Sequence, residues 1–400
     1  MYLNAAILTA VVLTGLAMWS PPALRSRPWR AMVTPLASII GSGFLVLGPI
    51  LNASYGAMAP LAMAALCTVA YLFGWAIRFN IAAIGDDARP RTRAEERLET
   101  LSSAVLGFAY MISVAYYLNL FGAFALSLTP AAADGRSARL LTTAVFAVIL
   151  LVGWGRGFKA LEAMEYFSVS LKLAIIMGLL VGMAAYFRDK VAAGGLVFTP
   201  PETTGWPAVA LGFGLIVTVQ GFETSRYLGE SYTARTRIRS MRWAQWLSSG
   251  IYMAYIVLLA YTFARGEIAL KETAIIDMMK VVAPILPLLL VAAALAAQFS
   301  AAVADTSGSG GLIAELSGHR LSTRQAYAVL TLVGVGLTWT ANLFEIIAYA
   351  SRAFAAYYAL QAAVAALGAR GAGRNGAMLG FAALALLGAA IVLAGKPVAG

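Results

Sequence analysis

The apolar run from Thr34 to Ile50 has the length of a membrane-spanning helix, yet Gly41-Ser42-Gly43 lies at its middle. Glycine is a poor helix former and Pro49 follows in the same run, so the helix is predicted to break there. In hydrocarbon, a break leaves backbone N–H and C=O groups unpaired, and each unpaired group costs several kcal/mol. Such breaks survive where they line a cavity or contact a ligand. The pattern is therefore typical of a binding site in a membrane transporter.

The overall composition indicates a membrane protein. Hydrophobic residues make up 61% of the 400 residues and charged residues only 12%, and the mean hydropathy is +0.80. A soluble fold of this length cannot hide so much apolar surface. The charges cluster between apolar runs that are long enough to cross the bilayer as helices, without the alternation that barrel strands require. We therefore expect an all-α polytopic membrane protein.

Residue content excludes several functional classes. The net charge of +11 does not indicate nucleic-acid binding, because the basic residues are spread over alternate loops. Cys67 and His319 are the single cysteine and histidine, so neither a disulfide nor a Cys- or His-rich metal site is expected. The sequence has no phosphate-binding glycine loop with lysine, no His-Glu metal motif and no Ser/His pair. The chain is not expected to be an enzyme, and no cofactor or metal is predicted.

Hydropathy predicts about twelve transmembrane helices. The first, from Tyr2 to Trp19, lacks a basic residue before its apolar run and a small-residue cleavage site, so it is expected to be retained as an anchor. The predicted spans are 2–20, 31–53, 56–79, 100–128, 139–155, 159–187, 206–230, 241–264, 283–306, 324–340, 343–368 and 376–395.

The arginines predict the orientation. Arginines are concentrated in alternate loops, and the loops of the opposite set are mixed or acidic. The richer set is predicted to be cytoplasmic, which puts both termini on the non-cytoplasmic side of a bacterial inner membrane. The richer set contains Arg25, Arg27, Arg30, Arg89, Arg91, Arg93, Arg97, Arg156, Arg235, Arg237, Arg239, Arg242, Arg320, Arg324, Arg370 and Arg374, and the opposite set contains Asp134, Asp189, Glu202, Glu267, Glu272 and Asp277.

A second interrupted helix is predicted at 206–230, where Gly212, Gly214 and Gly221 divide the apolar run. It crosses the membrane in the opposite direction to the first. Two interrupted helices at corresponding positions of inverted halves are the repeat signature of secondary transporters. The predicted organisation is an extra N-terminal helix with its basic loop (1–30), two five-helix inverted repeats (31–190 and 191–368, broken near 41–43 and 219–223) and a C-terminal helix (369–400).

Four segments carry a family resemblance. The first is Ile39-Ile-Gly-Ser-Gly-Phe-Leu-Val-Leu-Gly-Pro-Ile-Leu, followed by Ser54-Tyr-Gly-Ala-Met-Ala-Pro. It resembles the first helix and following turn of amino acid–polyamine–organocation (APC) transporters. The other three resemble the sixth, fifth and eighth helices of that family, and the likeness covers most of residues 31–368. It implies a LeuT-type fold with the binding site between two broken helices. These three are Gln220-Gly-Phe-Glu-Thr-Ser-Arg-Tyr-Leu-Gly-Glu; Gly157-Phe-Lys-Ala-Leu-Glu leading to Ser168-Val-Ser-Leu-Lys-Leu; and Ala296-Ala-Gln-Phe-Ser-Ala-Ala-Val-Ala-Asp through Ala314-Glu-Leu-Ser-Gly-His-Arg-Leu.

In the resembled family, backbone N–H groups at the first break receive the carboxylate of the substrate. The resemblance implies this role for Gly41, Ser42 and Gly43, with the carbonyls of Ile39 and Ile40 at the other broken end. The physics agrees, because a half-helix N-terminus carries a partial positive charge. The alternative interpretation is that these glycines only allow close helix packing.

The second break supplies further candidates for substrate binding. Carbonyls near Val219 and Gln220 are expected to accept from an ammonium group, and Gln220, Gly221 and Phe222 are candidate lining residues. Tyr117 lies on the helix that flanks the substrate in the resembled family, and it is a candidate for a hydrogen bond to ligand. The alternative for a tyrosine near the end of a span is an interfacial anchor.

Polar residues at membrane depth are candidates for proton coupling or gating. Glu223 follows the second break, and its alternative is a structural pair with Arg226. In sodium-independent members of the resembled family, a fifth-helix lysine occupies the sodium site, which implies that role for Lys172; the alternative is a structural cation bonded to first-helix carbonyls. Asp305 is the expected counter-charge and Ser300 a neighbouring partner, in a relay or in a buried ion pair.

These patterns favour a secondary active transporter that moves an amino acid or a related small organic amine by alternating access. Coupling to protons or exchange is expected, without sodium. Two alternatives stay open: an inorganic metal-cation transporter on the same fold, and a non-transporting membrane sensor or partner subunit. The expected partners are the lipid bilayer, the small-molecule substrate and protons.

Overall fold

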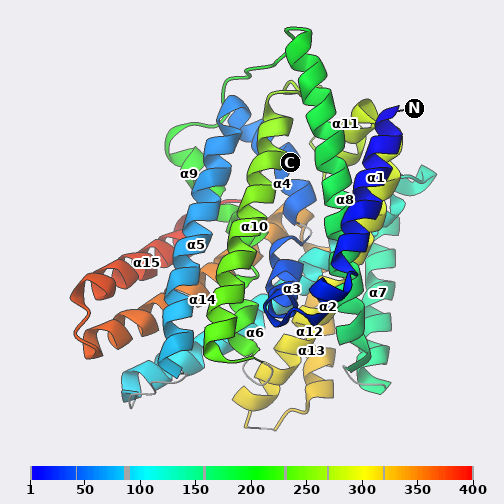
Figure 1. Cartoon of the computed structure of the whole chain (residues 1–400). Coiled ribbons are helices and arrows are strands. Elements are labelled where there is room, and N and C mark those ends of the chain that lie inside the picture. The colour runs from blue at the N-terminus through cyan, green and yellow to red at the C-terminus, as the bar shows by residue number, and fades with distance from the viewer. Residues whose placement is uncertain are drawn as a thin grey trace.

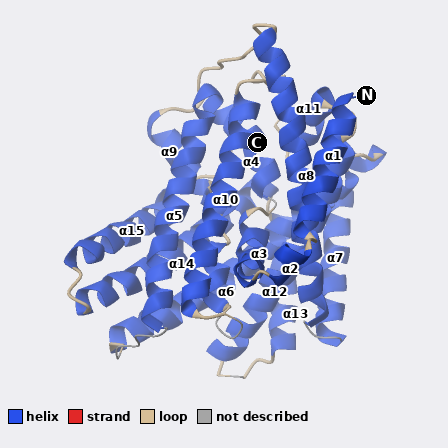
Figure 2. Ribbon diagram, viewed as in Figure 1, coloured by secondary structure: helices blue, strands red, loops and turns tan. Residues whose placement is uncertain are grey.

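The computed structural model describes residues 2–41, 43–84, 91–155, 159–228, 232–267, 270–318 and 320–398. All regular elements in these ranges are α-helices or 3-10 helices (Figure 2). The predicted all-α class is thereby confirmed for the described part of the chain. In chain order the elements are α1 (Tyr2–Met18), α2 (Pro21–Arg25), α3 (Arg27–Ile39), α4 (Gly43–Tyr55), η1 (Gly56–Met58), α5 (Ala59–Ile84), α6 (Arg93–Leu126), η2 (Pro130–Ala133), α7 (Gly135–Gly155), α8 (Lys159–Ala192), α9 (Gly205–Gly214), η3 (Ile216–Val219), η4 (Phe222–Tyr227), α10 (Ala234–Ala260), α11 (Ala274–Val282), α12 (Leu286–Leu316), α13 (Thr323–Thr340), α14 (Leu343–Gly371) and α15 (Asn375–Ala394).

Within the described residues, seven stretches are long and apolar enough to cross a membrane. Large apolar side chains such as Leu61, Leu332 and Leu386 are exposed on the helix surfaces, as expected for lipid contact. The chain is therefore an integral membrane protein by composition and helix length, while the count of twelve crossings stays a prediction. The stretches are Gly43–Ile84, Arg93–Leu126, Gly135–Trp154, Tyr166–Ala192, Ala234–Ala260, Leu286–Ala314 and Asn375–Ala394.

Capping boxes determine where several helices begin. The Thr92 hydroxyl accepts from the Glu95 N–H, and the Glu95 carboxylate accepts from the Thr92 N–H, so α6 begins at Arg93 rather than near residue 100 as predicted. Asn342 and Glu345 form the same reciprocal pair at the start of α14. Each box satisfies backbone donors that a helix start otherwise leaves unpaired.

The structure adds α11 in a segment that was expected to be a loop. Ile275, Ile276 and Met279 are buried at helical spacing, and this burial holds the short helix against the bundle. Burial raises the pKa of the Asp277 carboxyl, but hydrogen bonds from Lys271 (2.6 Å) and Lys280 (2.7 Å) outweigh it and leave that pKa below its usual value.

The N-terminal helix α1 packs along α8 (Figure 1). Two glycines four residues apart on α8 make the contact close: an added Cβ would lie 2.6 Å from Val11 Cγ2 at Gly178 and 3.0 Å from Ile7 Cδ1 at Gly182. This is the small-residue packing of transmembrane helices, in which van der Waals contact replaces hydrophobic association. The same helix α8 carries Lys172, so α1 supports a helix that reaches the centre of the molecule.

The remaining helices surround the two interrupted ones. α6 packs against α12 and α14, while α10 packs against α3, α4 and α5. In Figure 1, α12 ends and α13 begins at the lower end of the molecule, and the connection from α8 to α9 lies at the upper end, as does the N-terminus. The segment after α15 contacts α9, because the Lys396 N–H donates to the Ala210 carbonyl (2.9 Å). It also contacts α14, because the Arg352 guanidinium donates to the Gly395 carbonyl (2.6 Å).

Candidate functional site

The first break follows Ile39, where α3 ends, and α4 begins at Gly43. The Ile40 N–H still donates to the Leu36 carbonyl (3.1 Å), but its φ of −86° and ψ of 57° leave the helical region. An added Cβ at Gly41 would lie 3.0 Å from the Ser38 carbonyl oxygen and 3.7 Å from Tyr117 Cε1. The ring of Tyr117 therefore lies beside this break. Ser42, which was predicted to bind substrate, lies outside the described residues.

The second break, residues 215–221, separates α9 from η4. α9 ends at Gly214, the tighter helix η3 follows, and Gln220 is extended. Gly221 has a φ of 117°, which only glycine adopts without strain. The segment therefore changes direction at Gly221 instead of continuing as an α-helix.

The two breaks contact each other directly. An added Cβ at Gly221 would lie 2.5 Å from the Ser38 carbonyl carbon and 2.6 Å from the Ile39 nitrogen. At Gly43 the same atom would lie 2.8 Å from Thr218 Cα. Such distances are below van der Waals contact, so both positions require glycine. The interrupted segments thus approach backbone to backbone.

Tyr252 of α10 joins the two breaks. Its hydroxyl lies 3.0 Å from the Ile39 carbonyl oxygen and 2.6 Å from the Thr218 carbonyl oxygen. Both carbonyls belong to residues at which helical pairing stops, and the single O–H of Tyr252 is shared between them. Tyr252 is fully buried, and water therefore does not compete for these acceptors.

Two buried oxygen atoms beside the second break lack a hydrogen-bond partner among the described residues. The Gln220 amide donates from Nε2 to the Tyr117 hydroxyl (3.1 Å), which leaves Gln220 Oε1 without a donor. The Glu223 Oε2 atom accepts from the Gly221 N–H and from the Tyr358 hydroxyl, both at 2.9 Å, and Oε1 has no donor. Buried acceptors of this kind are costly unless a donor reaches them. They suit a ligand that carries N–H groups.

A small cavity lies beside the breaks, where Ile39 and Val219 meet α5 and α10. It measures about 10 Å³, which is room for about one water molecule. An amino acid does not fit in this volume. The lining residues are Ile39, Cys67, Ala70, Val219, Gln245, Ser248, Ser249 and Tyr252.

Comparison with known proteins identifies the family of the chain. A family model described as an APC superfamily transporter matches residues 21–395. The chain belongs to the APC superfamily of transporters. A relative from Aquifex aeolicus (strain VF5), named only as an uncharacterized protein, is 43% identical over 365 residues, which are 90% of this chain and 88% of the relative. The family predicted from the four motifs is thereby confirmed.

In this APC transporter, Lys172 contacts the first interrupted helix. Its Nζ atom donates to the Ala37 carbonyl at 2.5 Å, and the side chain is buried. Asp305 accepts from the Ser113 hydroxyl of α6, and the Ser300 hydroxyl donates within its own helix to the Ala297 carbonyl (3.2 Å). The Lys172 ammonium thus has a contact with α3, and the Asp305 carboxyl has a contact with α6.

Arg226 does not pair with Glu223, which was the structural alternative considered from the sequence. Arg226 forms an ion pair with Glu99 of α6 at 2.5 Å, whereas Glu223 contacts Gly221 and Tyr358. The sequence separation is 127 residues, so local spacing could not reveal this pair. Around it lies a polar cluster that connects α5, α6, η4 and α14, and that comprises Asn80, Glu99, Ser102, Arg226 and Gln361.

Of the two candidate residues Phe222 and Val219, Phe222 packs against other aromatic rings, whereas Val219 lines a small cavity. The Phe222 ring stacks on Tyr358 of α14 at 5.1 Å, and Tyr358 also stacks on Phe73 of α5 at 5.1 Å, so Tyr358 contacts both phenylalanine rings. Val219 lines the small cavity together with Ile39. The ring of Phe222 is therefore part of an aromatic stack next to the break.

Three further polar residues at this depth were not singled out from the sequence. Besides Tyr252, the Ser351 hydroxyl donates to the Gly214 carbonyl (2.7 Å) and accepts from the Val217 N–H (3.1 Å), which closes the end of α9. Gln298 is fully buried, and neither amide atom has a partner among the described residues. The sequence feature that could have identified these residues is a polar side chain in the middle of an apolar span, where such a group is energetically costly.

Proposed function

We propose that this APC superfamily member is a secondary active transporter for an amino acid or a related small organic amine. The observation that carries the proposal is the direct contact of the two breaks at Gly221, Ser38 and Ile39, with Tyr252 bridging their carbonyls. Main-chain groups that are not used in helices form polar positions inside an apolar bundle. The LeuT-type five-plus-five arrangement belongs to the same proposal.

The chemistry around the breaks favours a zwitterion. N–H groups at the start of α4, from residues 41–43, are proposed to receive the carboxylate, since a helix N-terminus favours negative charge. On the opposite side, Gln220 Oε1 and Glu223 Oε1 are acceptors without a described donor. An ammonium group supplies the donors that these oxygens lack. The carbonyls of Ile39, Ile40 and Val219 are the proposed acceptors next to them.

Coupling is proposed to run through Lys172 and not through sodium. The ammonium group lies at the Ala37 carbonyl, within one turn of the first break. A fixed positive charge there disfavours a second cation through Coulomb repulsion. Loss of its proton would turn a charge-assisted hydrogen bond into a weaker neutral one and so weaken the link between α8 and α3. Glu223 and Asp305, both fully buried, are the proposed acids that exchange protons with this region.

Alternating access is proposed to use the polar cluster as a closed gate. Arg226 follows the second break and is held to Glu99, near the start of α6. Because this end of α6 is predicted to be cytoplasmic, the pair keeps that side shut. Separation of η4 from α6 would open a path from the breaks to the cytoplasm.

Uptake into proteoliposomes tests the proposal. Purified protein is reconstituted, an inward proton gradient is imposed, and uptake of a radiolabelled panel of amino acids and amines is measured. The matched controls are a sodium gradient without a proton gradient and protein-free vesicles. We expect uptake of at least one zwitterion or amine that follows the proton gradient or exchange with internal solute.

Other results would contradict the proposal in distinct ways. Uptake of a metal cation without any amine flux would support an inorganic-ion carrier. Absence of flux together with an unchanged thermal midpoint for the full panel would support a sensor or partner subunit. A ligand that binds the folded state raises its stability by mass action, so the thermal screen detects binding without transport.

The Gln220→Ala variant tests the site separately from coupling. The change removes the hydrogen bond to Tyr117 and the free acceptor, and we expect the solute affinity to fall about tenfold, equivalent to about 1.4 kcal/mol. Gln325→Ala is the matched control, because that glutamine caps α13 at its exposed start. Equal solute affinity in the two variants would contradict the assignment of Gln220.

A further inference from the structure

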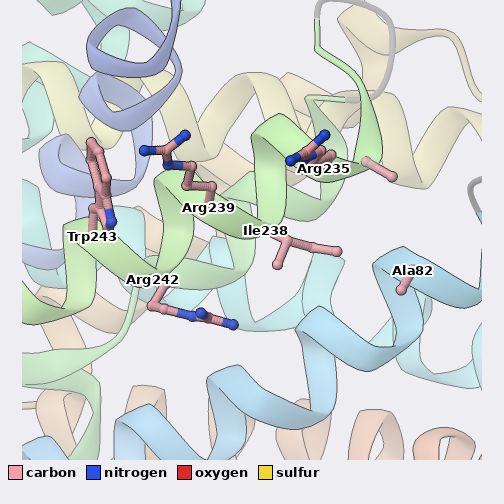
Figure 3. A pocket seen from close by; sticks show the side chains of 7 residues that line it. Ala82, Arg235, Ile238, Arg239, Arg242 and Trp243 are labelled. Carbon is pink, nitrogen blue, oxygen red and sulfur yellow. The ribbon is translucent and has the colours of Figure 1, made fainter.

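A large cavity lies away from the two breaks, between the first turns of α10 and the last turn of α5 (Figure 3). It measures about 560 Å³, which is within the range of small-molecule sites. Ala82, Ala234 and Ile238 form its apolar part, and Arg235, Arg239, Arg242 and Trp243 form the rest. We call this cavity the arginine pocket.

The three arginines of the pocket share one face of α10. Their spacing of four and three residues places them on adjacent turns, and Figure 3 shows Arg242 extending into the space between α10 and α5. All three are exposed, and in the described part of the chain no ion pair involves them. Arg237, in contrast, turns inward and donates to the Arg226 carbonyl (2.7 Å). The pocket therefore holds positive charge without a described protein counter-charge.

The helix end adds to this positive charge. The first turn of α10 contains no acidic residue, although acids are the residues that stabilise a helix N-terminus. Arginines at that end oppose the helix dipole. An anion bound in the pocket would offset both the dipole and the mutual repulsion of the arginines.

Aromatic residues indicate the depth of the pocket in the bilayer. Trp243, which directly follows Arg242, is 40% exposed, and Trp246, about one turn further along α10, is 59% exposed. The Arg239 guanidinium lies 4.5 Å from the centre of the Trp243 ring. Exposed tryptophans next to arginines are typical of the level of lipid headgroups.

We propose that the arginine pocket binds the phosphodiester headgroup of an anionic phospholipid. Guanidinium groups bind phosphate oxygens in a bidentate manner, and the apolar wall formed by Ala82 and Ile238 is suited to the glycerol and the first methylene groups. A soluble phosphate shares the charge but makes no use of the apolar wall or of the exposed tryptophans. The site does not depend on which solute is carried at the breaks.

Lipid-dependent stabilisation tests the site. The unfolding midpoint of the full chain in neutral detergent is measured with short-chain phosphatidylglycerol, with phosphatidylcholine of the same chain length, and with inorganic phosphate. We expect only phosphatidylglycerol to raise the midpoint. Each arginine near a membrane surface changes anion affinity by about fivefold, so the triple variant R235Q/R239Q/R242Q is expected to weaken binding by on the order of 100-fold.

The control variant is R320Q/R324Q/R370Q. It removes the same charge from exposed arginines that are predicted on the same membrane side but lie outside the pocket. We expect it to keep the affinity of the unmodified protein. If the pocket triple variant does not fold, R239Q alone is expected to weaken binding about fivefold.

Three outcomes would overturn the proposal. Equal weakening by the two triple variants would show non-specific attraction to the whole basic side. Equal stabilisation by phosphatidylcholine would show that headgroup charge is irrelevant. An effect of inorganic phosphate that matches phosphatidylglycerol would make the ligand a soluble anion instead of a lipid.

Discussion

The two breaks are stabilised in different ways. The exposed carbonyls of the first interrupted helix are satisfied by distant helices: Ala37 by Lys172 of α8, and Ile39 by Tyr252 of α10. The second break also uses distant helices, since Tyr252 contacts the Thr218 carbonyl and Ser351 contacts Gly214 and Val217. Its turn at Gly221, in contrast, is closed by neighbouring residues. Glu223 accepts from the Gly221 N–H (2.9 Å), and the Thr224 hydroxyl donates to the Gly221 carbonyl (2.7 Å).

This difference predicts which break responds when the bundle moves. A displacement of α8 or α10 removes hydrogen-bond donors from the first interrupted helix, so its carbonyls become available to solute. The turn at Gly221 keeps its local shape, because its donors and acceptors belong to Glu223 and Thr224 and travel with it. We infer that this turn stays rigid, while the carbonyls of Ala37, Ile39 and Thr218 exchange hydrogen bonds when α8 or α10 moves.

The largest effect is expected for Gly221→Ala. In the alanine variant, the positive φ adds backbone strain that lowers the free energy of unfolding by about 1–3 kcal/mol. The close contact with Ser38 and Ile39 adds overpacking that lowers it by about another 1–3 kcal/mol. Gly205→Ala is the control, since that glycine has a φ of +61° but open space around it. Unfolding in detergent should show a much larger loss for the first variant. Equal losses of unfolding free energy in the two variants would mean that the two breaks are not in close van der Waals contact.

Removal of the Lys172 ammonium tests the dependence of the first break on α8. For Lys172→Met we expect gradient-driven uptake to fall by about tenfold or more, the equivalent of at least about 1.4 kcal/mol in a rate, while solute binding changes less. Lys190→Met, at the end of the same helix beside Tyr186, should leave uptake intact. Equal loss of binding and uptake in Lys172→Met would indicate a purely structural lysine.

Some of these features follow from local sequence and others do not. Helix interruptions at Gly41–Gly43 and Gly221 depend on the backbone preferences of glycine, so the residues themselves indicate them. The contact between Arg226 and Glu99 and the bridge made by Tyr252 join segments that are far apart in the chain. Such contacts depend on how the helices pack. The packing of α1 on Gly178 and Gly182 is intermediate, since the glycine spacing is local but its partner is not.

Tyr252→Phe tests the bridge between the breaks. Without its hydroxyl, the Ile39 and Thr218 carbonyls lose a donor, and we expect a loss of about 1–3 kcal/mol in unfolding free energy. Tyr255→Phe is a close control, because Tyr255 lies one turn along α10 and its buried hydroxyl has no partner among the described residues. That variant should be neutral or more stable. A loss in Tyr255→Phe that equals the loss in Tyr252→Phe would remove the special role of the bridge.

The smallest effect is expected for Thr224→Val, which tests whether the second break maintains its own shape. The change deletes one hydrogen bond to the Gly221 carbonyl, while the bond between Glu223 and the Gly221 N–H remains. We expect a loss of about 1 kcal/mol in unfolding free energy and an unchanged solute affinity. Thr68→Val removes a comparable hydroxyl-to-carbonyl bond within α5 and gives the baseline for such a deletion. A fall in solute affinity in Thr224→Val would show that the turn at Gly221 also exchanges hydrogen bonds, and its proposed rigidity would be wrong.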